Sequence, residues 1–452
     1  MNYTICRQLT TMAALIWLIH CLPVNRINAE TGESAQSDYS VAVDTIIIEG
    51  ARVTKPFIIT REMTIHSGDH ITPGQLEENR NRIQNLGLFT RVEVFMRREN
   101  RRNQLVVEVT ELWYIFPFPF WRKEAGDFSK ITYGLQYLQK NFRGRNERIS
   151  ASIWMGYEEG YQLAYFNPWF AQRGTWGLAA EIFDVFRDIN NEKHRELKAE
   201  IETIGGRTSV QRRFGLDPRL TATIGFTRYR TDYTELMIAN DLYDDWFSLN
   251  VAFLSDRRDL YEYPAHGWFR SVNLSGSTLL NGPKSASKTV MATASLELRH
   301  YKQIFQNFIL CERAIIGISS GDVPLYRRYF LGSGVRVRGW SGDTEEGEGL
   351  FLGSLELRRH IFDIRYFTWN SAPVLKRYFR NLKYGLSGAL FVDLGQVWID
   401  PGETTSKEFQ AGWGLGLHIH LPYLDLLRAE AGWSPDSKFE DAKLSIRSRV
   451  AF

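Results

Sequence analysis

Several short patterns in the sequence combine residue types that carry out chemistry in enzymes. Gly317-Ile-Ser-Ser-Gly321 matches the hydrolase pattern Gly-x-Ser-x-Gly, in which a helix begins directly after the serine turn. Here Gly-Asp-Val-Pro follows Ser320 and favours a turn instead of a helix. We therefore expect Ser319 to lie at a strand end and not to act as a nucleophile. The sequence predicts no catalytic residue and no enzyme.

Two further patterns carry side chains that bind metal ions. His418 and His420 share one face of a predicted strand, but a zinc site needs further ligands nearby, so we expect them to line a lumen or an interface. Glu345, Glu346 and Glu348 offer carboxylates of the kind that calcium prefers, although a solvated acidic loop is the simpler interpretation. The sequence predicts neither a bound metal nor a cofactor.

The composition limits the elements that can position these residues. The chain has 452 residues, a mean hydropathy of −0.29, 13% aromatic residues and 36 glycines. This polarity excludes a protein built from several membrane-spanning helices, since each needs ~20 mainly apolar residues. Residues 1–29 hold Arg7 and Arg26 and no acidic residue, so the rest of the chain has 53 basic and 52 acidic residues, and this net charge of +1 argues against a nucleic-acid-binding protein. The arginines at 97–98 and 101–102 are interpreted as a solvated hairpin turn.

The N-terminus has the features of a secretory signal peptide. Arg7 precedes the apolar stretch 12–19, and Ala29 offers a small residue for cleavage. A lipoprotein signal ending at Cys21 is the alternative, but the bulky His20 before that cysteine disfavours it. A buried core helix fits poorly with the polar segment that follows. We predict a signal peptide over residues 1–29.

Cleavage after residue 29 would leave a chain that begins with a polar segment and contains one cysteine. A polar linker is predicted over residues 30–40. Removal of Cys6 and Cys21 leaves Cys311 alone, which excludes an intramolecular disulfide framework.

Residues 41–111 are predicted to form a small α+β domain with the order β-α-α-β-β. Thr72-Pro-Gly-Gln75 has the form of a capping box that begins a helix, and Gly87 ends it. The other predicted elements are strands at 43–48, 91–95 and 105–109 and a short helix at 56–63. The segment 112–130 is predicted as an aromatic, proline-containing linker, because Pro117 and Pro119 exclude a regular helix. Its rings suit a membrane surface.

Beyond residue 131 the sequence consists of short alternating segments. Apolar residues alternate with charged or small residues at 197–202, 290–298 and 443–452, which places the two kinds on opposite faces of a strand. A soluble sandwich would alternate too, but the charges are too frequent for a packed core. Aromatic residues also cluster near strand ends, as at 165–170. We predict an all-β membrane barrel of about 16 antiparallel strands over residues 131–452.

Residues 41–111 resemble a polypeptide-transport-associated (POTRA) domain. The matching residues are Ile46-Ile-Ile-Glu-Gly50, Arg61-Glu62, Ser67-Gly-Asp69, Leu86-Gly-Leu-Phe89, Val92 and Val94. Such domains expose a strand edge that suits the addition of an extended client strand. The Leu-Gly-Leu-Phe pattern does not recur, so a single POTRA domain is expected.

Two motifs in the C-terminal region resemble the signature of the BamA/TamA superfamily of outer-membrane barrel assembly and translocation proteins. They are Phe330-Leu-Gly-Ser-Gly-Val-Arg-Val-Arg-Gly-Trp340 and Phe391-Val-Asp-Leu-Gly395. Further matches flank them at 141–147, 167–169, 256–267 and 353–358. Either motif alone is a weak pattern, and the combination is specific. The single POTRA domain is the main departure from the family.

The resemblance implies that Val337-Arg338-Gly339-Trp340 lies at the tip of a loop folded into the barrel lumen, where Arg338 pairs with Asp393. A guanidinium matches a carboxylate as a rigid fork, and a shielded lumen makes an unpaired charge costly. Gly339 would allow the tight tip and Gly395 would leave room for it. These residues, with Phe391, form the expected lumen-loop lock.

The resemblance also implies a role for the last strand. Leu444, Ile446, Val450 and Phe452 alternate with polar residues and end the chain on an aromatic ring. This pattern resembles the C-terminal signal that barrel assembly machinery reads.

The family resemblance implies an outer-membrane protein of bacteria with its POTRA domain in the periplasm. Its expected function is to insert β-barrel proteins into the outer membrane or to translocate polypeptides across it. The expected partners are unfolded outer-membrane or secreted polypeptides, outer-membrane lipids and periplasmic accessory proteins, but not nucleic acid. A dedicated exporter of one secreted partner would keep every motif, whereas a passive pore would need neither the POTRA domain nor the lock.

Overall fold

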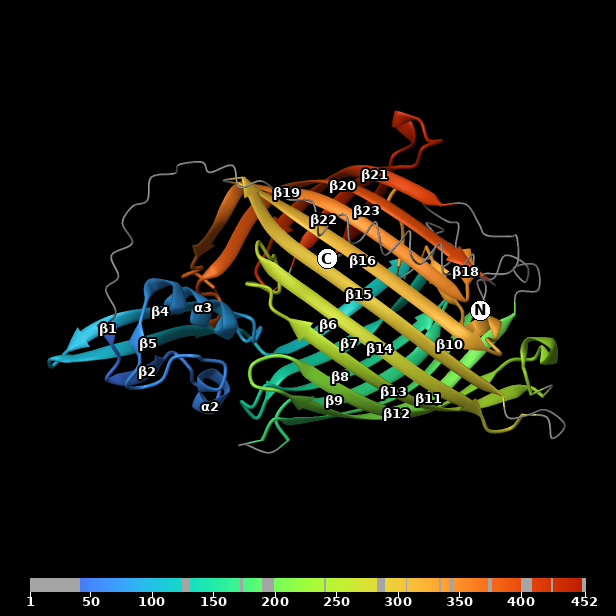
Figure 1. The fold of residues 1–452 in the computed structure, drawn as a ribbon, viewed down its shortest axis with the longest axis horizontal. Helices are drawn as coiled ribbons and strands as arrows, with labels where there is room; N and C mark the ends of the chain where they lie inside the picture. The colour runs from blue at the N-terminus through green and yellow to red at the C-terminus, as the bar shows by residue number, and fades with distance from the viewer. Residues whose placement is uncertain are drawn as a thin grey trace, which may run out of the picture.

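The computed structural model describes residues 41–123, 131–170, 174–188, 199–239, 241–282, 289–305, 307–332, 335–340, 345–372, 376–399, 409–423 and 426–448. A small mixed domain sits at one rim of a large β-barrel (Figure 1). The expected signal peptide (1–29) and linker (30–40) lie outside the described residues. Every helix in the described ranges is too short or too polar to cross a bilayer.

The small domain has the predicted order of helices and strands. Its three-stranded sheet has the order β2-β5-β4, with β2 parallel and β4 antiparallel to the central β5. The elements are β1 (Val41–Ala42), β2 (Thr45–Glu49), α2 (Pro56–Thr60), β3 (His70–Ile71), α3 (Pro73–Gln84), β4 (Phe89–Glu99) and β5 (Arg102–Glu111). The short strands β1 and β3 pair beside this sheet.

Local sequence signals explain how the helices of this domain begin and pack. The backbone N–H of Thr72 donates to Oε1 of Gln75 at 2.8 Å, which is half of the predicted capping box. Ile58, Ile59 and Ile83 turn inward onto the sheet and are fully buried. Burial of these side chains against the valines of β5 gives the domain a core of its own.

The barrel is one sheet of 16 strands, in which each strand pairs antiparallel with its neighbour in the sheet order. Its strands are β6 (Ile115–Lys123), β7 (Ile131–Phe142), β8 (Glu147–Gly156), β9 (Glu159–Asn167), β10 (Trp176–Asp188), β11 (Glu200–Arg213), β12 (Arg219–Arg230), β13 (Tyr243–Asp256), β14 (Gly267–Leu279), β15 (Val290–Phe305), β16 (Phe308–Gly321), β19 (Gly349–Phe367), β20 (Leu382–Trp398), β21 (Gln410–His420), β22 (Leu427–Trp433) and β23 (Lys443–Arg447). The predicted fold class, a barrel of about 16 strands after one small α+β domain, is confirmed.

The loop between β16 and β19 contains a separate hairpin of β17 (Tyr329–Leu331) and β18 (Glu345–Gly347). Short 3-10 turns lie at Thr234–Leu236, Leu325–Arg327, Lys376–Tyr378 and Phe439–Asp441. We refer to residues 329–347 as the lumen loop.

The strands alternate between the two faces of the barrel wall. In β20, Leu390, Val392 and Leu394 are exposed on the outer face, whereas Phe391 and Asp393 are buried inside. An apolar outer face with a polar inner face is the pattern of a barrel that lies in lipid. Because the mean hydropathy averages apolar outer residues with polar inner ones, it does not reveal the membrane-facing surface.

The expected linker over residues 112–130 is wrong in its central part. Ile115–Lys123 forms strand β6, which pairs with β7 over nine residues from Ile115–Gln139 to Lys123–Ile131. Prolines are tolerated in a strand when their missing N–H would point away from the ladder. The barrel wall therefore begins earlier than the predicted residue 131.

The last strand is short in the described residues. Leu444 and Ile446 lie in β23 and are 81% and 75% exposed, on the outer face. Val450 and Phe452 lie outside the described residues. The proposed C-terminal signal is thus visible only in its first half.

Candidate functional site

The lumen loop is held inside the barrel by apolar and polar contacts at its tip. Val337 packs in a buried cluster with Leu331, Leu350 and Val397. The indole N–H of Trp340 donates to the carbonyl of Ala411 on β21 at 2.8 Å. The motif therefore lies inside the barrel and contacts several strands of its C-terminal third.

Arg338 contacts Asp393 through one edge of its guanidinium. Nε donates to Oδ2 at 2.7 Å and Nη2 donates to Oδ1 at 2.8 Å. The backbone N–H of Arg338 donates to the same carboxylate at 3.0 Å, and the guanidinium stacks 3.6 Å from the ring centroid of Phe391. Bidentate geometry fixes orientation as well as charge, so the two motifs are joined at this point.

The sequence alone did not reveal the rest of the cluster around Arg338. Its Nη1 donates to Glu356 at 2.5 Å and to Glu430 at 3.1 Å. Arg428 bridges the same two carboxylates at 2.7 Å each, and Arg358 donates to Glu356 at 2.7 Å. In these ion pairs three guanidinium groups face three carboxylates, so the charges within this cluster of six side chains balance.

Glycines allow the backbone of the loop tip to touch the barrel wall. Gly339 has a φ of +101°, and a Cβ there would lie 2.4 Å from the carbonyl oxygen of Trp433. A Cβ on Gly395 would lie 2.6 Å from Val337, as expected from its place in the second motif. A Cβ on Gly412 would lie 1.9 Å from the carbonyl oxygen of Arg338. The tip therefore fits against the wall only because none of these three positions carries a side chain.

The buried carboxylates beside His418 could in principle bind a metal. Glu356, His418 and Glu430 bring one ligand atom each within 4.8 Å of one another. Both oxygens of Glu356 and one of Glu430 already accept hydrogen bonds from arginines. A divalent cation would have to displace a guanidinium, so ion pairing accounts for this group. His418 instead lies 3.3 Å from the hydroxyl of Tyr263.

The structure also places the Gly-x-Ser-x-Gly pattern and the acidic residues of the lumen loop. Ser319 lies near the end of strand β16, and no α-helix follows it in the described residues. The interpretation of Glu346 and Glu348 as solvated is wrong, because both carboxylates pair with Arg328, at 3.2 and 3.7 Å. Their side chains are largely buried beside the lumen loop.

A second site joins the small domain to the barrel rim. Glu62, directly after α2, forms a buried bidentate pair with Arg213 at the end of β11, with N–O distances of 2.6 and 2.7 Å. The guanidinium carbon of Arg61 lies 3.2 Å from the ring centroid of Trp169. Burial lowers the pKa of Arg61 to about 10. The Arg61-Glu62 pair of the POTRA-like motif thus contacts the Asn167-Pro-Trp169 motif and the end of β11.

Other turns on the same rim add to this junction. The side chain of Asn141 donates to Oγ1 of Thr54 at 2.9 Å, and the N–H of Lys55 donates to the carbonyl of Gly144 at 2.9 Å. Asn85 exchanges two hydrogen bonds with the 256–267 turn, at 2.9 and 2.8 Å. Three of the four flanking motifs therefore meet at this interface, whereas 353–358 lies in β19 and supplies Glu356 and Arg358 to the cluster around Arg338.

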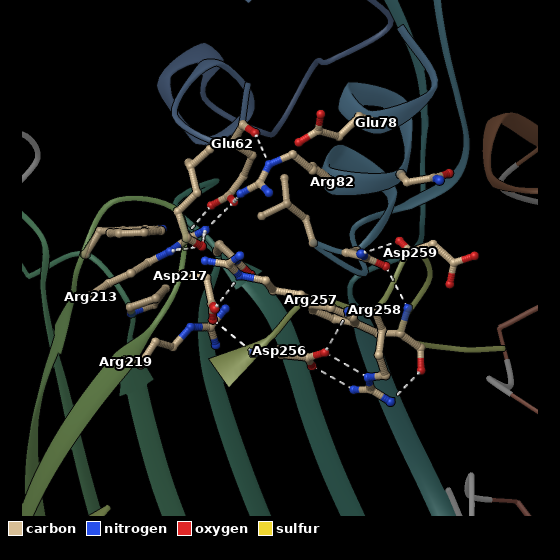
Figure 2. Close-up of a pocket in the computed structure, with 18 of the residues that line it drawn as sticks. Glu62, Glu78, Arg82, Arg213, Asp217, Arg219, Asp256, Arg257, Arg258 and Asp259 are labelled. Atoms are coloured by element: carbon tan, nitrogen blue, oxygen red, sulfur yellow. Dashed lines mark hydrogen bonds and ion pairs between the residues drawn. The ribbon is translucent and has the colours of Figure 1, made fainter. Parts of the chain in front are cut away.

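A charged cleft of about 700 Å³ lies between this domain and the rim. Figure 2 shows Glu62, Glu78 and Arg82 on the domain side and Arg219 and Arg257 among the barrel residues. Asp256 and Arg258 pair across the turn between β13 and β14, at 2.8 and 2.7 Å. The cleft is lined by side chains of both charges, which suits polar or extended peptide segments.

The fold and these contacts define a class of protein: an outer-membrane β-barrel with an ion-paired loop in its lumen and a POTRA domain docked on its rim. The Omp85 superfamily domain matches residues 141–443, and the surface antigen variable number repeat of the POTRA family matches residues 41–112. The chain belongs to the Omp85 superfamily. It is an outer-membrane protein, and the rim that carries the POTRA domain is the periplasmic rim.

Individual proteins show the same relationship. The chain is 24% identical to outer membrane protein assembly factor BamA of Nitratidesulfovibrio vulgaris, over 88% of this chain and 51% of that protein, so it spans about half the length of that relative. BamA from Haemophilus ducreyi lacking POTRA domains 1–3 has a TM-score of 0.53 and 17% identity, with 90% and 83% of the two chains covered. CdiB from Escherichia coli has a TM-score of 0.55 and 13% identity, with 90% and 75% covered.

Proposed function

We propose that this protein inserts β-barrel proteins into the outer membrane or translocates polypeptides across it, without catalysing a covalent reaction. The observation that carries the proposal is the buried Glu62–Arg213 pair, which fixes a client-receiving domain directly at the mouth of the barrel. A passive pore gains nothing from such a docked domain. The clients are unfolded outer-membrane or secreted polypeptides.

The POTRA domain would receive the client in the periplasm. Its sheet ends in β2 and β4, whose outer edges carry no further strand among the described residues. Such edges pair with extended polypeptides through backbone hydrogen bonds. The driving force is the folding of the client and the burial of its apolar face in lipid. Outer-membrane lipids and periplasmic accessory proteins are the other proposed partners.

The lumen-loop lock would keep the barrel in a defined state between clients. Arg338, Asp393 and Phe391 hold the loop tip against the C-terminal strands. Removal of one partner leaves buried charge uncompensated, so the loop has one strongly favoured position. Leu444, Ile446, Val450 and Phe452 would serve a different purpose, as the signal by which the chain itself is assembled.

Depletion of the protein followed by quantitative proteomics of the outer membrane tests the proposal. Broad loss of barrel proteins supports an insertase, and loss of one secreted protein supports a dedicated exporter. An unchanged proteome would contradict the proposal and favour a passive pore. Rescue with the Glu62→Gln variant separates the role of the docked domain from that of the barrel.

A further inference from the structure

The free edge of β6 can be assigned from one hydrogen bond. The N–H of Lys140 donates to the carbonyl of Tyr114 at 2.8 Å, and the register places these two residues opposite each other, next to the pair Ile115–Gln139. In an antiparallel ladder, residues whose polar groups face the partner strand alternate with residues whose polar groups face away. The even-numbered residues of β6 therefore bond to β7. The odd-numbered residues point their N–H and C=O groups toward the other edge.

Two of the positions on that edge have no donor. Pro117 and Pro119 both belong to the odd set, and proline lacks an N–H. Their carbonyls remain as acceptors. The edge can therefore accept hydrogen bonds along its whole length, but it cannot donate at two successive edge positions in the middle of the strand.

This edge is one end of the barrel sheet. The sheet order begins at β6 and ends at β23, and no backbone pairing joins the two within the described residues. At the periplasmic rim β6 lies beside the turn between β21 and β22, where the rings of Phe116 and Tyr423 are 6.3 Å apart. That turn leads into β22, the strand with which β23 pairs. Pro117 and Pro119 are exposed on the outer face, where lipid offers no substitute hydrogen bonds. A strand that pairs here leaves two of its carbonyls without donors.

We propose that Pro117 and Pro119 keep the β6 edge from pairing completely, so that the seam with β23 opens readily and a client strand leaves β6 quickly. The claim about release of a client strand rests on the proposed function. The claim about opening of the seam between β6 and β23 concerns only this chain. In this view β6 is an edge for transient pairing with extended strands, and its two prolines set how long a strand stays.

Pro117→Ala/Pro119→Ala tests the inference because it restores both donors and leaves the lumen-loop lock untouched. The purified full chain is reconstituted in phospholipid vesicles, with Trp121→Cys and either Leu444→Cys or Ile446→Cys as cross-linking pairs near the far rim. Two restored hydrogen bonds should shift the seam toward the closed form about 30-fold, which corresponds to about 2 kcal/mol. Each single Pro→Ala variant should give an intermediate shift.

Three measurements accompany the variants. Heat-modified mobility verifies that each barrel is folded. Disulfide yield reports seam closure, and release of a fluorescent, urea-unfolded small barrel protein reports client residence. Leu135→Ala is the matched control, because Leu135 pairs with Pro119 and faces outward but its loss adds no amide donor. The control should match the unsubstituted chain in both readouts.

The outcomes distinguish the inference about the prolines from the proposed function. Higher disulfide yield together with slower client release supports the inference. An unchanged disulfide yield in the folded double variant overturns it, and so does closure that leaves client release unchanged. If the unsubstituted chain inserts no client, the proposed function fails, while the cross-linking yield still decides whether the prolines hold the seam open.

Discussion

Substitution of Arg338 by alanine should destabilise the barrel strongly. In wild-type protein the ion-paired cluster places Arg338, Arg358 and Arg428 against Glu356, Asp393 and Glu430. Arg338→Ala leaves two guanidinium groups against three carboxylates in a buried site. Removing one partner of a buried ion pair costs about 3–5 kcal/mol, and we expect a loss of this size in the free energy of unfolding.

Two companion variants show whether charge balance is the cause. Arg338→Lys keeps the charge but loses the fork to Asp393, so it should cost about 1–3 kcal/mol. Arg338→Ala/Asp393→Ala removes one charge of each sign and restores the balance. The double variant should therefore be about 2 kcal/mol more stable than the sum of the two single losses.

Urea-induced unfolding of the purified barrel in detergent micelles measures these differences, with tryptophan fluorescence and heat-modified mobility as two independent probes. Client insertion is measured in parallel on variants that remain folded. The charge-balance reasoning is refuted if the single losses are additive in the double variant. It is equally refuted if Arg338→Ala unfolds at the wild-type urea concentration.

Three further results are expected. Gly339→Ala should cost about 1–3 kcal/mol in urea unfolding, because its φ is +101° and the new Cβ would overlap the backbone of Trp433; a wild-type midpoint would contradict this packing. Glu62→Gln should leave the buried guanidinium of Arg213 without its counter-charge and raise the undocked fraction of the POTRA domain roughly 100-fold, measured as faster protease cleavage at the junction; an unchanged cleavage rate would show that the pair does not hold the domain. Cys311 is fully buried, so its thiol should react with a maleimide only after denaturation, and rapid labelling of this cysteine in the folded barrel would contradict its position.

Much of the fold follows from local patterns in the sequence. The capping box at Thr72 and the glycine at position 87 suffice to predict α3, since both signals act within a few residues. Period-2 alternation and chain length suffice for the barrel and its number of strands. Strand β6 could not be predicted because prolines are rare in strands. Only the pairing with β7 shows that the N–H groups that Pro117 and Pro119 lack would face the free edge of the sheet.

One part of the candidate site could be predicted from family resemblance, and not from local patterns. The Arg338–Asp393 pair follows from resemblance to a family, and nothing in local spacing specifies it. Glu356, Arg428 and Glu430 lie on β19 and β22, and they meet Arg338 only because the strands from β19 to β22 pair in one register. The Glu62–Arg213 pair joins residues 151 positions apart. No local signal encodes such contacts, so the sequence could not reveal them.

The buried arginine cluster has a consequence for how the chain itself folds. Arg338 precedes the strands that supply Glu356, Asp393 and Glu430, and the last of these lies on the penultimate strand. A nascent barrel that lacks β22 offers Arg338 only part of its carboxylate set, and it also lacks Arg428. The loop can therefore settle in its final place only after nearly the whole wall is complete. Insertion of the tip is a late step of folding and marks a barrel whose C-terminal strands are in register.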